Sequence, residues 1–241
     1  MERFLKKYRK EILNLFKNKK YYELIVLCTE LMHKFMIPRC IKDRTNITPY
    51  DRSIMTKFNL QEYVNASLLE KYKFIAAQLP KPEFKEDFFR LILNSECKLI
   101  ISLVDCKDED YFEENELVER KVIFYHKEES FYDELYKFKG KFLIRRLRYL
   151  NWNDFSIPCG FEFSNFVNYY SKIKNDSFVI VHCLAGVGRT GTFIMYDILS
   201  KYEKVTDENF IDLFLELRSF RNCLVYNDLQ FKFLVLHFMQ K

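Results

Sequence analysis

A cysteine and an arginine inside one glycine-rich turn are the residues of this chain best suited to do chemistry. They lie in the run VIVHCLAGVGRTGT, residues 179–192. The apolar residues 178–181 predict a short buried strand, and the apolar spacing of residues 190–201 predicts a helix. Backbone N–H groups of the turn point inward and the helix start adds partial positive charge, so the turn forms an anion cradle. Arg189 adds a planar fork that fits two phosphate oxygens.

Cys183 lies at the entrance of this cradle. The field that attracts phosphate also stabilises a thiolate, which is the reactive form of cysteine. A thiolate held against a bound phosphate is a nucleophile directed at phosphorus, and a cysteinyl-phosphate is its natural product. The alternative is a buried cysteine that only packs after a strand. The glycines, His182, Arg189 and the Thr-Gly-Thr run share one strand–turn–helix context, which favours the chemical interpretation.

The sequence HCLAGVGRTGT closely resembles the phosphate-binding loop of the classical protein tyrosine phosphatases. The resemblance implies that Cys183 is the nucleophile, that Arg189 binds phosphate, and that the Thr190 hydroxyl helps the thiolate leave. It also implies that loop positions bind the substrate phosphate, here Leu184, Ala185, Gly186, Val187 and Gly188. Leu184 replaces a small polar residue of the family. We expect this change to be tolerated because the position contributes its backbone N–H.

Residues 149–158, YLNWNDFSIP, resemble the mobile Trp-Pro-Asp loop of the same family, with Asn153 in the proline position. The resemblance implies that Asp154 protonates the leaving phenolate oxygen and then activates water. Such a group typically contributes about 100- to 10,000-fold to the rate. Trp152 would anchor the loop hinge. Proline fixes φ and Asn153 does not, so we expect altered closure and a slower enzyme. The alternative is that Asp154 only occupies a turn.

Residues 41–54, IKDRTNITPYDRSI, resemble the family segment that lines one wall of the phosphotyrosine pocket. The family places a tyrosine there, stacked on the substrate ring, where this chain has Arg44 or Thr45. Asn46 replaces an aspartate that holds the substrate backbone. Ring stacking is worth roughly 0.5–1.5 kcal/mol beyond burial, so its loss weakens the selection for phosphotyrosine.

Residues 221–230, RNCLVYNDLQ, resemble the last family motif, which carries two glutamines that position the hydrolytic water. The first is Tyr226 here and the second survives as Gln230. We expect slower hydrolysis of the intermediate or a relaxed choice of acceptor. In the family a carboxylate from the acidic stretch 105–119 orients the arginine, and Asp108 and Glu109 are equal candidates for that role. The alternative for this stretch is a solvated surface.

The remaining patterns predict the elements that position these residues. Helices are expected over 84–95, 161–173, 210–220 and 231–238, and strands in 62–80, 99–104, 121–125, 131–138 and 141–150, with a turn at Gly140. The resemblance covers residues 41–238 and implies an α/β fold, a highly twisted mixed sheet flanked by helices. At 241 residues and 49% hydrophobic content, one domain over 1–241 is expected. Its segment 1–40 would form two amphipathic helices packed on the rest.

Composition narrows the class of protein. Seven cysteines without disulfide or metal-ligand spacing indicate reduced thiols in the cytoplasm, and no metal or cofactor is expected. The sequence shows neither a signal peptide nor a span of bilayer length. A net charge of +5 does not argue for nucleic acid. The basic cluster at residues 6–10 fits a solvated helix face better than a membrane-surface or partner-binding helix. Plentiful Phe, Tyr, Lys, Ile and Asn are typical of an A+T-rich genome, which would place a viral or parasitic protein in a host cytoplasm.

Three functions compete. The first is hydrolysis of phosphotyrosine in signalling proteins through a phosphocysteine intermediate, with phosphotyrosyl proteins as partners. The second is a weakly active or inactive phosphotyrosine-binding pseudophosphatase, supported by the departures at 44–46, 153 and 226. The third is a phosphatase of phosphoserine, a phosphoinositide or an RNA 5′-phosphate, which the altered wall permits. Retention of Cys183, Arg189, Asp154 and Gln230 favours the first.

Overall fold

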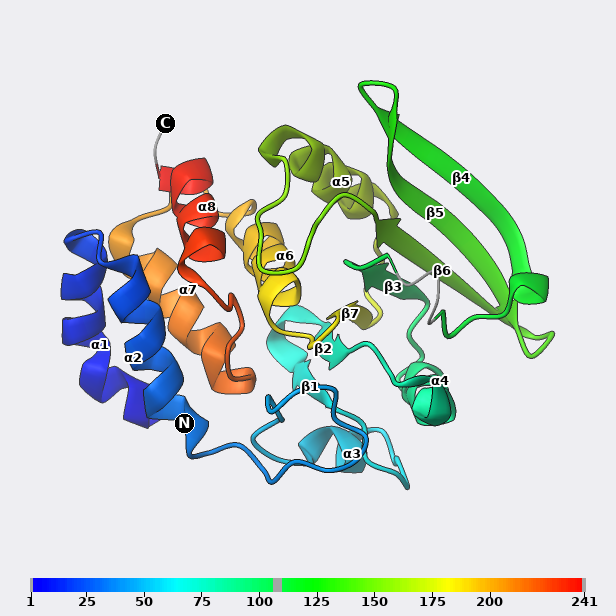
Figure 1. Ribbon diagram of the computed structural model, residues 1–241, viewed down its shortest axis with the longest axis horizontal. Coiled ribbons are helices and arrows are strands. Elements are labelled where there is room, and N and C mark those ends of the chain that lie inside the picture. The colour runs from blue at the N-terminus through cyan, green and yellow to red at the C-terminus, as the bar shows by residue number, and fades with distance from the viewer. Residues whose placement is uncertain (1, 106–109, 240–241) are drawn as a thin grey trace.

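The computed structural model describes residues 2–105 and 110–239, and these form one domain around a single mixed sheet of seven strands (Figure 1). The strands are β1 (Ala66–Leu69), β2 (Phe74–Gln78), β3 (Leu99–Ser102), β4 (Leu117–Tyr125), β5 (Glu128–Phe138), β6 (Phe142–Tyr149) and β7 (Val179–Cys183). Their order is β1-β2-β7-β3-β6-β5-β4. The four central strands β2, β7, β3 and β6 are parallel, whereas β1, β5 and β4 pair antiparallel at the two ends. The expected mixed sheet is therefore confirmed.

The helices cover both faces of this sheet. They are α1 (Glu2–Lys17), α2 (Tyr21–His33), α3 (Ser53–Lys57), α4 (Lys85–Asn94), α5 (Gly160–Ile173), α6 (Gly188–Leu199), α7 (Asp207–Phe220) and α8 (Asp228–Met239). Short 3₁₀ turns occur at η1 (Glu70–Tyr72), η2 (Pro82–Phe84) and η4 (Glu114–Glu116).

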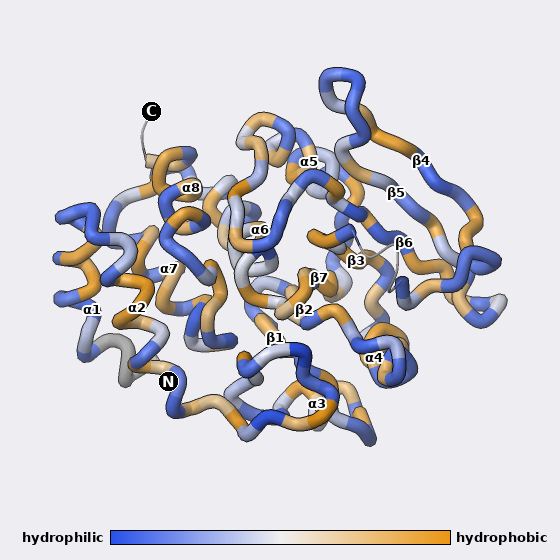
Figure 2. The backbone as a smooth tube through the Cα atoms, in the orientation of Figure 1, coloured by the Kyte–Doolittle hydropathy of each residue, from blue (hydrophilic) through white to orange (hydrophobic). Residues whose placement is uncertain are grey.

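The strand β7 is buried along its whole length because helices pack on both of its faces. Val179 and Val181 belong to the core shared with α5 to α8, whereas Ile180 belongs to the core shared with α3 and α4. Figure 2 shows the hydrophobic colour at β7 and the hydrophilic tip of the β4–β5 hairpin. The end of β7 therefore lies at the centre of the molecule.

The two N-terminal helices pack against α7 and α8 rather than standing apart (Figure 1). Phe16 is buried and stacks on Phe210 with ring centroids 5.5 Å apart. Arg9, from the basic cluster, forms two hydrogen bonds with the carboxylate of Asp212 on α7. This segment braces α7 and α8, and α8 carries the pocket residue Gln230 discussed below.

The five-residue helix α3 was not expected, since its few apolar residues give too short a pattern to separate a helix from a loop. Strand β4 begins at Leu117, four residues before the predicted start at 121. It is an edge strand with mostly exposed side chains, so the sequence carries little apolar alternation over its first half. The turn at Gly140 is present, with a φ of +68°.

Candidate active site

Cys183 ends β7 between β2 and β3, and α6 begins only five residues later at Gly188. The intervening loop is pressed onto β2. Gly186 has a φ of +71°, and a Cβ atom there would lie 2.1 Å from the carbonyl oxygen of Ala77. Only glycine fits both the left-handed backbone and this approach. The tight turn keeps the N-terminus of α6 beside the Cys183 thiol, which is 3% exposed.

A second arginine, Arg221, holds this loop from its buried side. Its Nε donates to the carbonyl oxygen of Gly186 at 2.9 Å, and one Nη donates to that of Ala185 at 3.0 Å and to Asn65 Oδ1 at 2.6 Å. In a trans peptide the N–H points opposite to the C=O. The N–H groups of the same two peptides therefore point away from Arg221. Burial lowers the pKa of Arg221.

Sequence reasoning missed Arg221 as a site residue. It comes directly after the apolar helix predicted over 210–220 and five residues before Tyr226. Such a position gave no indication that the side chain turns inward. It is fully buried in the structure.

Arg189 occupies the first turn of α6 and is almost fully buried. One Nη donates to the carbonyl oxygen of Trp152 at 2.9 Å, and the other donates to Asp154 Oδ1 at 3.1 Å. Its Nε is buried and has no hydrogen-bond partner among the described residues, and the same is true of Thr190 Oγ1. A buried unpaired polar group costs about 1–3 kcal/mol. Two of them in the first turn of α6, the helix that follows Cys183, mark a place where an oxyanion would be stabilised.

These elements enclose a pocket of about 450 Å³. Three segments line it together with Cys183, namely the wall 45–47, the loop 154–155 and the segment 226–230. The lining residues are Thr45, Asn46, Ile47, Asp154, Phe155, Cys183, Leu184, Ala185, Val187, Gly188, Tyr226 and Gln230. The structure thus brings most of the site residues expected from the sequence to one cavity. Gly186, Arg189 and Thr190 lie in the same loop and helix start without lining it.

The loop that carries Asp154 is held at its base by Trp152, whose indole Nε1 donates to the carbonyl oxygen of Ser156 at 2.9 Å. Trp152 is buried, whereas the Asp154 side chain is 46% exposed. The hydrogen bonds of Arg189 to this loop dock it over the cysteine. Asp154 therefore lies at the mouth of the pocket and not in a remote turn.

The wall formed by residues 44–47 has no aromatic side chain. Arg44 points away from the pocket, and its guanidinium donates to the carbonyl oxygens of Leu79 at 2.6 Å and Pro80 at 2.7 Å. Thr45 lines the cavity instead. Asn46 is exposed at the rim and accepts a hydrogen bond from Arg39 at 3.2 Å. Of the two residues predicted to replace the tyrosine, Thr45 therefore faces the pocket.

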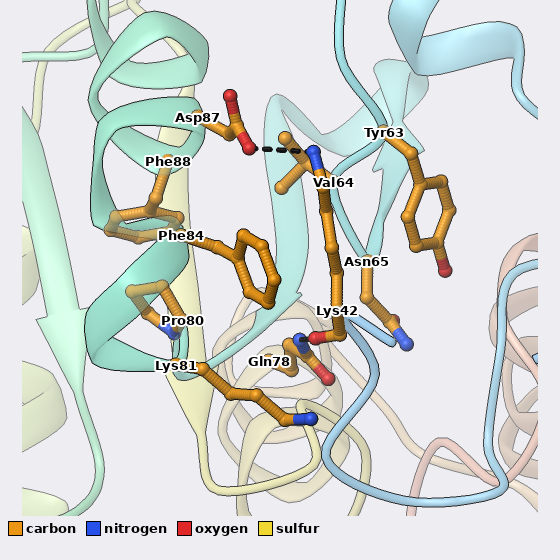
Figure 3. A pocket seen from close by; sticks show the side chains of 10 residues that line it. All are labelled: Lys42, Tyr63, Val64, Asn65, Gln78, Pro80, Lys81, Phe84, Asp87 and Phe88. Atoms are coloured by element: carbon orange, nitrogen blue, oxygen red, sulfur yellow. Dashed lines mark hydrogen bonds and ion pairs between the residues drawn. The ribbon is translucent and has the colours of Figure 1, made fainter. Parts of the chain in front are cut away.

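A small pocket next to this wall shows how the wall is anchored (Figure 3). The Lys42 ammonium reaches across it to Asp87 on α4 at 2.7 Å, with its stem beside the ring of Phe84. Gln78, at the end of β2, donates to the carbonyl oxygen of Lys42 at 2.6 Å and accepts from the backbone N–H of Arg44 at 3.0 Å. The wall is therefore fixed to the sheet and to α4.

Gln230, at the start of α8, lines the same cavity and is buried. Its Oε1 accepts the backbone N–H of Tyr226 at 3.1 Å, and its Nε2 points to the carbonyl oxygen of Ser156 at 3.4 Å. A Cβ atom on Gly188 would approach the Gln230 amide to 3.0 Å. The amide is thus held between the 183–189 loop and the loop of Asp154.

Asp108 and Glu109, the candidates for orienting Arg189, lie outside the described residues. The neighbouring Asp110 instead binds Arg146, at 2.6 and 2.7 Å. His182 is fully buried, and its Nε2 shares a hydrogen bond with the Tyr111 hydroxyl at 2.9 Å. Burial lowers the pKa of His182 to about 3, so this imidazole is neutral at pH 7.

Residues 41–240 match the family model described as protein-tyrosine phosphatase. The chain belongs to the protein-tyrosine phosphatase family. The resemblance seen in the 183–189 loop is therefore confirmed over most of the sequence.

Several relatives show how far the likeness extends. Receptor-type tyrosine-protein phosphatase eta of Gallus gallus is 30% identical over 221 residues, covering 78% of this chain and 16% of the relative. Tyrosine-protein phosphatase non-receptor type 20 of Mus musculus is 28% identical over 214 residues, covering 78% of this chain and 50% of the relative. Phosphatidylinositol phosphatase PTPRQ of Homo sapiens is 30% identical over 203 residues, covering 72% of this chain and 8% of the relative. The chain thus spans half or less of each relative.

Among solved structures, one of PTPN18 in complex with HER2-pY1196 phosphopeptides superposes with a TM-score of 0.73 and 20% sequence identity. The superposition covers 94% of this chain and 96% of that chain. This likeness confirms the expected fold.

Three further findings bear on the setting of the site. Over residues 2–105 and 110–239, no helix has both the length and the apolar character needed to cross a bilayer. The same residues contain no group of three or more His, Cys, Asp or Glu side chains arranged to hold a metal ion. All six cysteines in the described part of the chain are free thiols.

Proposed function

We propose that this protein hydrolyses phosphotyrosine in proteins through a cysteinyl-phosphate intermediate. The observation that carries the proposal is the convergence of Cys183, Asp154 and Gln230 on one pocket whose floor is the start of α6. The unpaired Nε of Arg189 beside them supports binding of a phosphate oxygen. Family membership supports the same chemistry, because the relatives are named as tyrosine phosphatases.

In the first step the phosphate dianion binds the loop N–H groups and Arg189. The thiolate of Cys183 attacks phosphorus as the bond from phosphorus to the phenolic oxygen breaks. Asp154 supplies the proton that this oxygen takes up. In the structure Asp154 occupies one Nη of Arg189, so an incoming phosphate competes for that donor.

In the second step water attacks the phosphorus of the cysteinyl-phosphate, and the thiolate of Cys183 leaves. Asp154, now a carboxylate, takes the proton of the water. The Gln230 amide orients that water, and its hydrogen bonds to the Tyr226 and Ser156 backbone support this role. The buried Thr190 hydroxyl, unpaired among the described residues, is available to donate to the departing sulfur.

The test is phosphate release from a phosphotyrosyl peptide in the presence of a chelator. Wild-type protein should turn over, Cys183→Ser should release no phosphate, and vanadate should inhibit. Peroxide should inactivate the enzyme, and a thiol should restore it, because the thiolate oxidises reversibly to sulfenic acid. Absence of release from every phosphopeptide and small aryl phosphate would refute the proposal. The free cysteines and the need for a reduced nucleophile support a cytoplasmic location.

A second candidate is a phosphatase of another ester, and the wall at Thr45 is the observation that favours it. Without an aromatic side chain on that side, the pocket selects less strongly for a ring. One relative is named a phosphatidylinositol phosphatase. Turnover of phosphotyrosyl, phosphoseryl, phosphoinositide and RNA 5′-phosphate substrates, compared at equal enzyme concentration, separates these possibilities. Tight binding of phosphotyrosyl peptide with negligible turnover would instead indicate a pseudophosphatase.

A further inference from the structure

Two aromatic side chains line the same pocket as the altered wall. Among the described residues that line it, Phe155 and Tyr226 are the aromatic ones. Their rings pack together with centroids 5.9 Å apart at an angle of 56°. Both remain open to solvent, with 61% of Phe155 and 38% of Tyr226 exposed. The pair therefore presents apolar ring surface at the mouth of the cavity.

The position of Tyr226 is tightly determined by its backbone. The preceding Val225 donates to the carbonyl oxygen of Val187 at 3.3 Å, and its own carbonyl accepts from buried Arg218 at 2.8 Å. Tyr226 then donates its N–H to Gln230 Oε1. A Cβ atom on Gly188 would lie 3.3 Å from the Tyr226 Cβ. The ring thus rises from the edge of the 183–189 loop.

Phe155 is fixed to the same segment. Its carbonyl oxygen accepts from the side-chain amide of Asn227 at 2.9 Å, and its φ is +59°. A left-handed backbone at an aromatic residue is uncommon and is sustained by surrounding contacts. Phe155 comes from the loop of the proposed general acid and Tyr226 from the segment before α8. The two aromatic residues join these segments at the pocket mouth.

We infer that Tyr226, with Phe155 behind it, supplies the aromatic wall for the substrate ring that residues 44–47 do not provide. A phosphate seated over Cys183 directs its ester oxygen toward the mouth. The attached aryl group then occupies the space between Thr45 and the Tyr226 ring. Tyr226 is thereby a specificity-determining residue that favours aryl over alkyl phosphates. This inference rests on the function proposed above and names its substrate-selecting surface.

The inference is tested by binding in a Cys183→Ser background, which removes turnover. Phenyl phosphate and inorganic phosphate are titrated by calorimetry into the parent protein and into Tyr226→Ala, Tyr226→Phe and Leu229→Ala. Leu229 is the matched control, since it is 53% exposed nearby on α8 and does not line the pocket. Loss of the ring should weaken phenyl phosphate by about 3- to 10-fold, the range typical of aromatic packing, and leave inorganic phosphate unchanged. Tyr226→Phe should restore the preference.

The two proposals fail in different ways. If Tyr226→Ala weakens the binding of phenyl phosphate and of inorganic phosphate equally, or leaves the preference for phenyl phosphate unchanged, the inference about the aromatic wall is wrong. The proposed phosphatase function would still stand. If the parent protein does not bind inorganic phosphate, the proposed phosphate site is refuted, and the inference about the aromatic wall fails with it. A parallel assay on the active enzyme provides the kinetic readout. There Tyr226→Ala should raise KM for aryl phosphates more than KM for phosphoserine peptides.

Discussion

The turn after Cys183 requires a left-handed backbone at Gly186 and a close approach of that residue to β2. Replacing Gly186 with alanine tests both requirements. A Cβ atom at this position would lie 2.1 Å from the Ala77 carbonyl oxygen and 2.6 Å from the Gln78 nitrogen. Both are backbone atoms of β2, paired in register with β7, so neither can rotate away. Restoring a contact of 3.0 Å requires the loop to move about 0.9 Å. The left-handed φ adds a cost of about 1–2 kcal/mol for a non-glycine residue.

The chain offers a matched control in Gly140, whose φ is +68° and whose Cβ would meet nothing within 4 Å. Gly140→Ala should lower the free energy of unfolding only by the cost of a left-handed φ at a non-glycine residue. Gly186→Ala should lower the free energy of unfolding further. It should also lower kcat/KM by about 100-fold, since a shift of about 1 Å in a reacting group has that effect. Urea unfolding and aryl phosphate kinetics measure the two quantities. If Gly186→Ala keeps kcat/KM within about 3-fold of wild type, the turn does not determine the position of the phosphate-binding amides.

Three further outcomes are expected. Asp154→Asn should lower kcat for a phosphotyrosyl peptide by about 100- to 10,000-fold and change KM little, and an unchanged kcat would remove Asp154 as the acid. Arg221→Met should lower the urea midpoint and the affinity for inorganic phosphate, because each acceptor left unpaired costs about 1–3 kcal/mol; an unchanged midpoint would contradict this. The folded-state pKa of His182 lies near 3, below its usual 6.5, so the unfolded chain takes up this proton first and stability falls as the pH drops from 6.5 toward 3. His182→Gln should make melting temperature less dependent on pH over that range, and an equal dependence would refute the assignment.

The sequence predicted the parts of the site whose residues are neighbours along the chain. The run from Cys183 to Thr190 combines the proposed nucleophile, two glycines and an arginine in one turn, so local spacing alone suggested its chemistry. The central strands were also predictable, because burial on both faces makes them continuously apolar. Short elements such as α3 were not, since five residues carry too little periodicity.

The contacts that complete the site join residues far apart in sequence, and here sequence reasoning reached its limit. Arg221 and Gly186 are 35 positions apart, and nothing local indicates that a surface-type side chain would serve buried carbonyl groups. Whether Arg44 or Thr45 faces the pocket likewise depends on a contact distant in sequence. The Arg44 guanidinium donates to the carbonyl oxygens of residues 79 and 80, just after β2, so Thr45 faces the pocket. The packing of Phe155 on Tyr226 spans 71 positions. Each of these features follows from tertiary contacts.

Three non-glycine residues in the segments around the pocket have a strained backbone, and nearby hydrogen bonds compensate for the strain. Cys223, Val225 and Phe155 all have φ near +60°, where a side chain costs stability, most of all a β-branched one such as valine. Two buried guanidinium groups supply the compensating hydrogen bonds. Arg218 binds the carbonyl oxygens of Leu224 and Val225, and Arg221 binds those of the turn after Cys183.

The strained conformations place Tyr226 and Phe155 at the mouth of the pocket. The hydrogen bonds that compensate for the strain therefore also maintain the shape of the pocket. Relaxing Val225 to an ordinary φ would withdraw its carbonyl from Arg218 and its N–H from Val187. Both changes would release the segment that carries Tyr226 and Gln230. The hydrogen bonds of the buried arginines therefore offset the backbone strain and keep the cavity preformed. A preformed cavity lowers the conformational cost of binding a substrate.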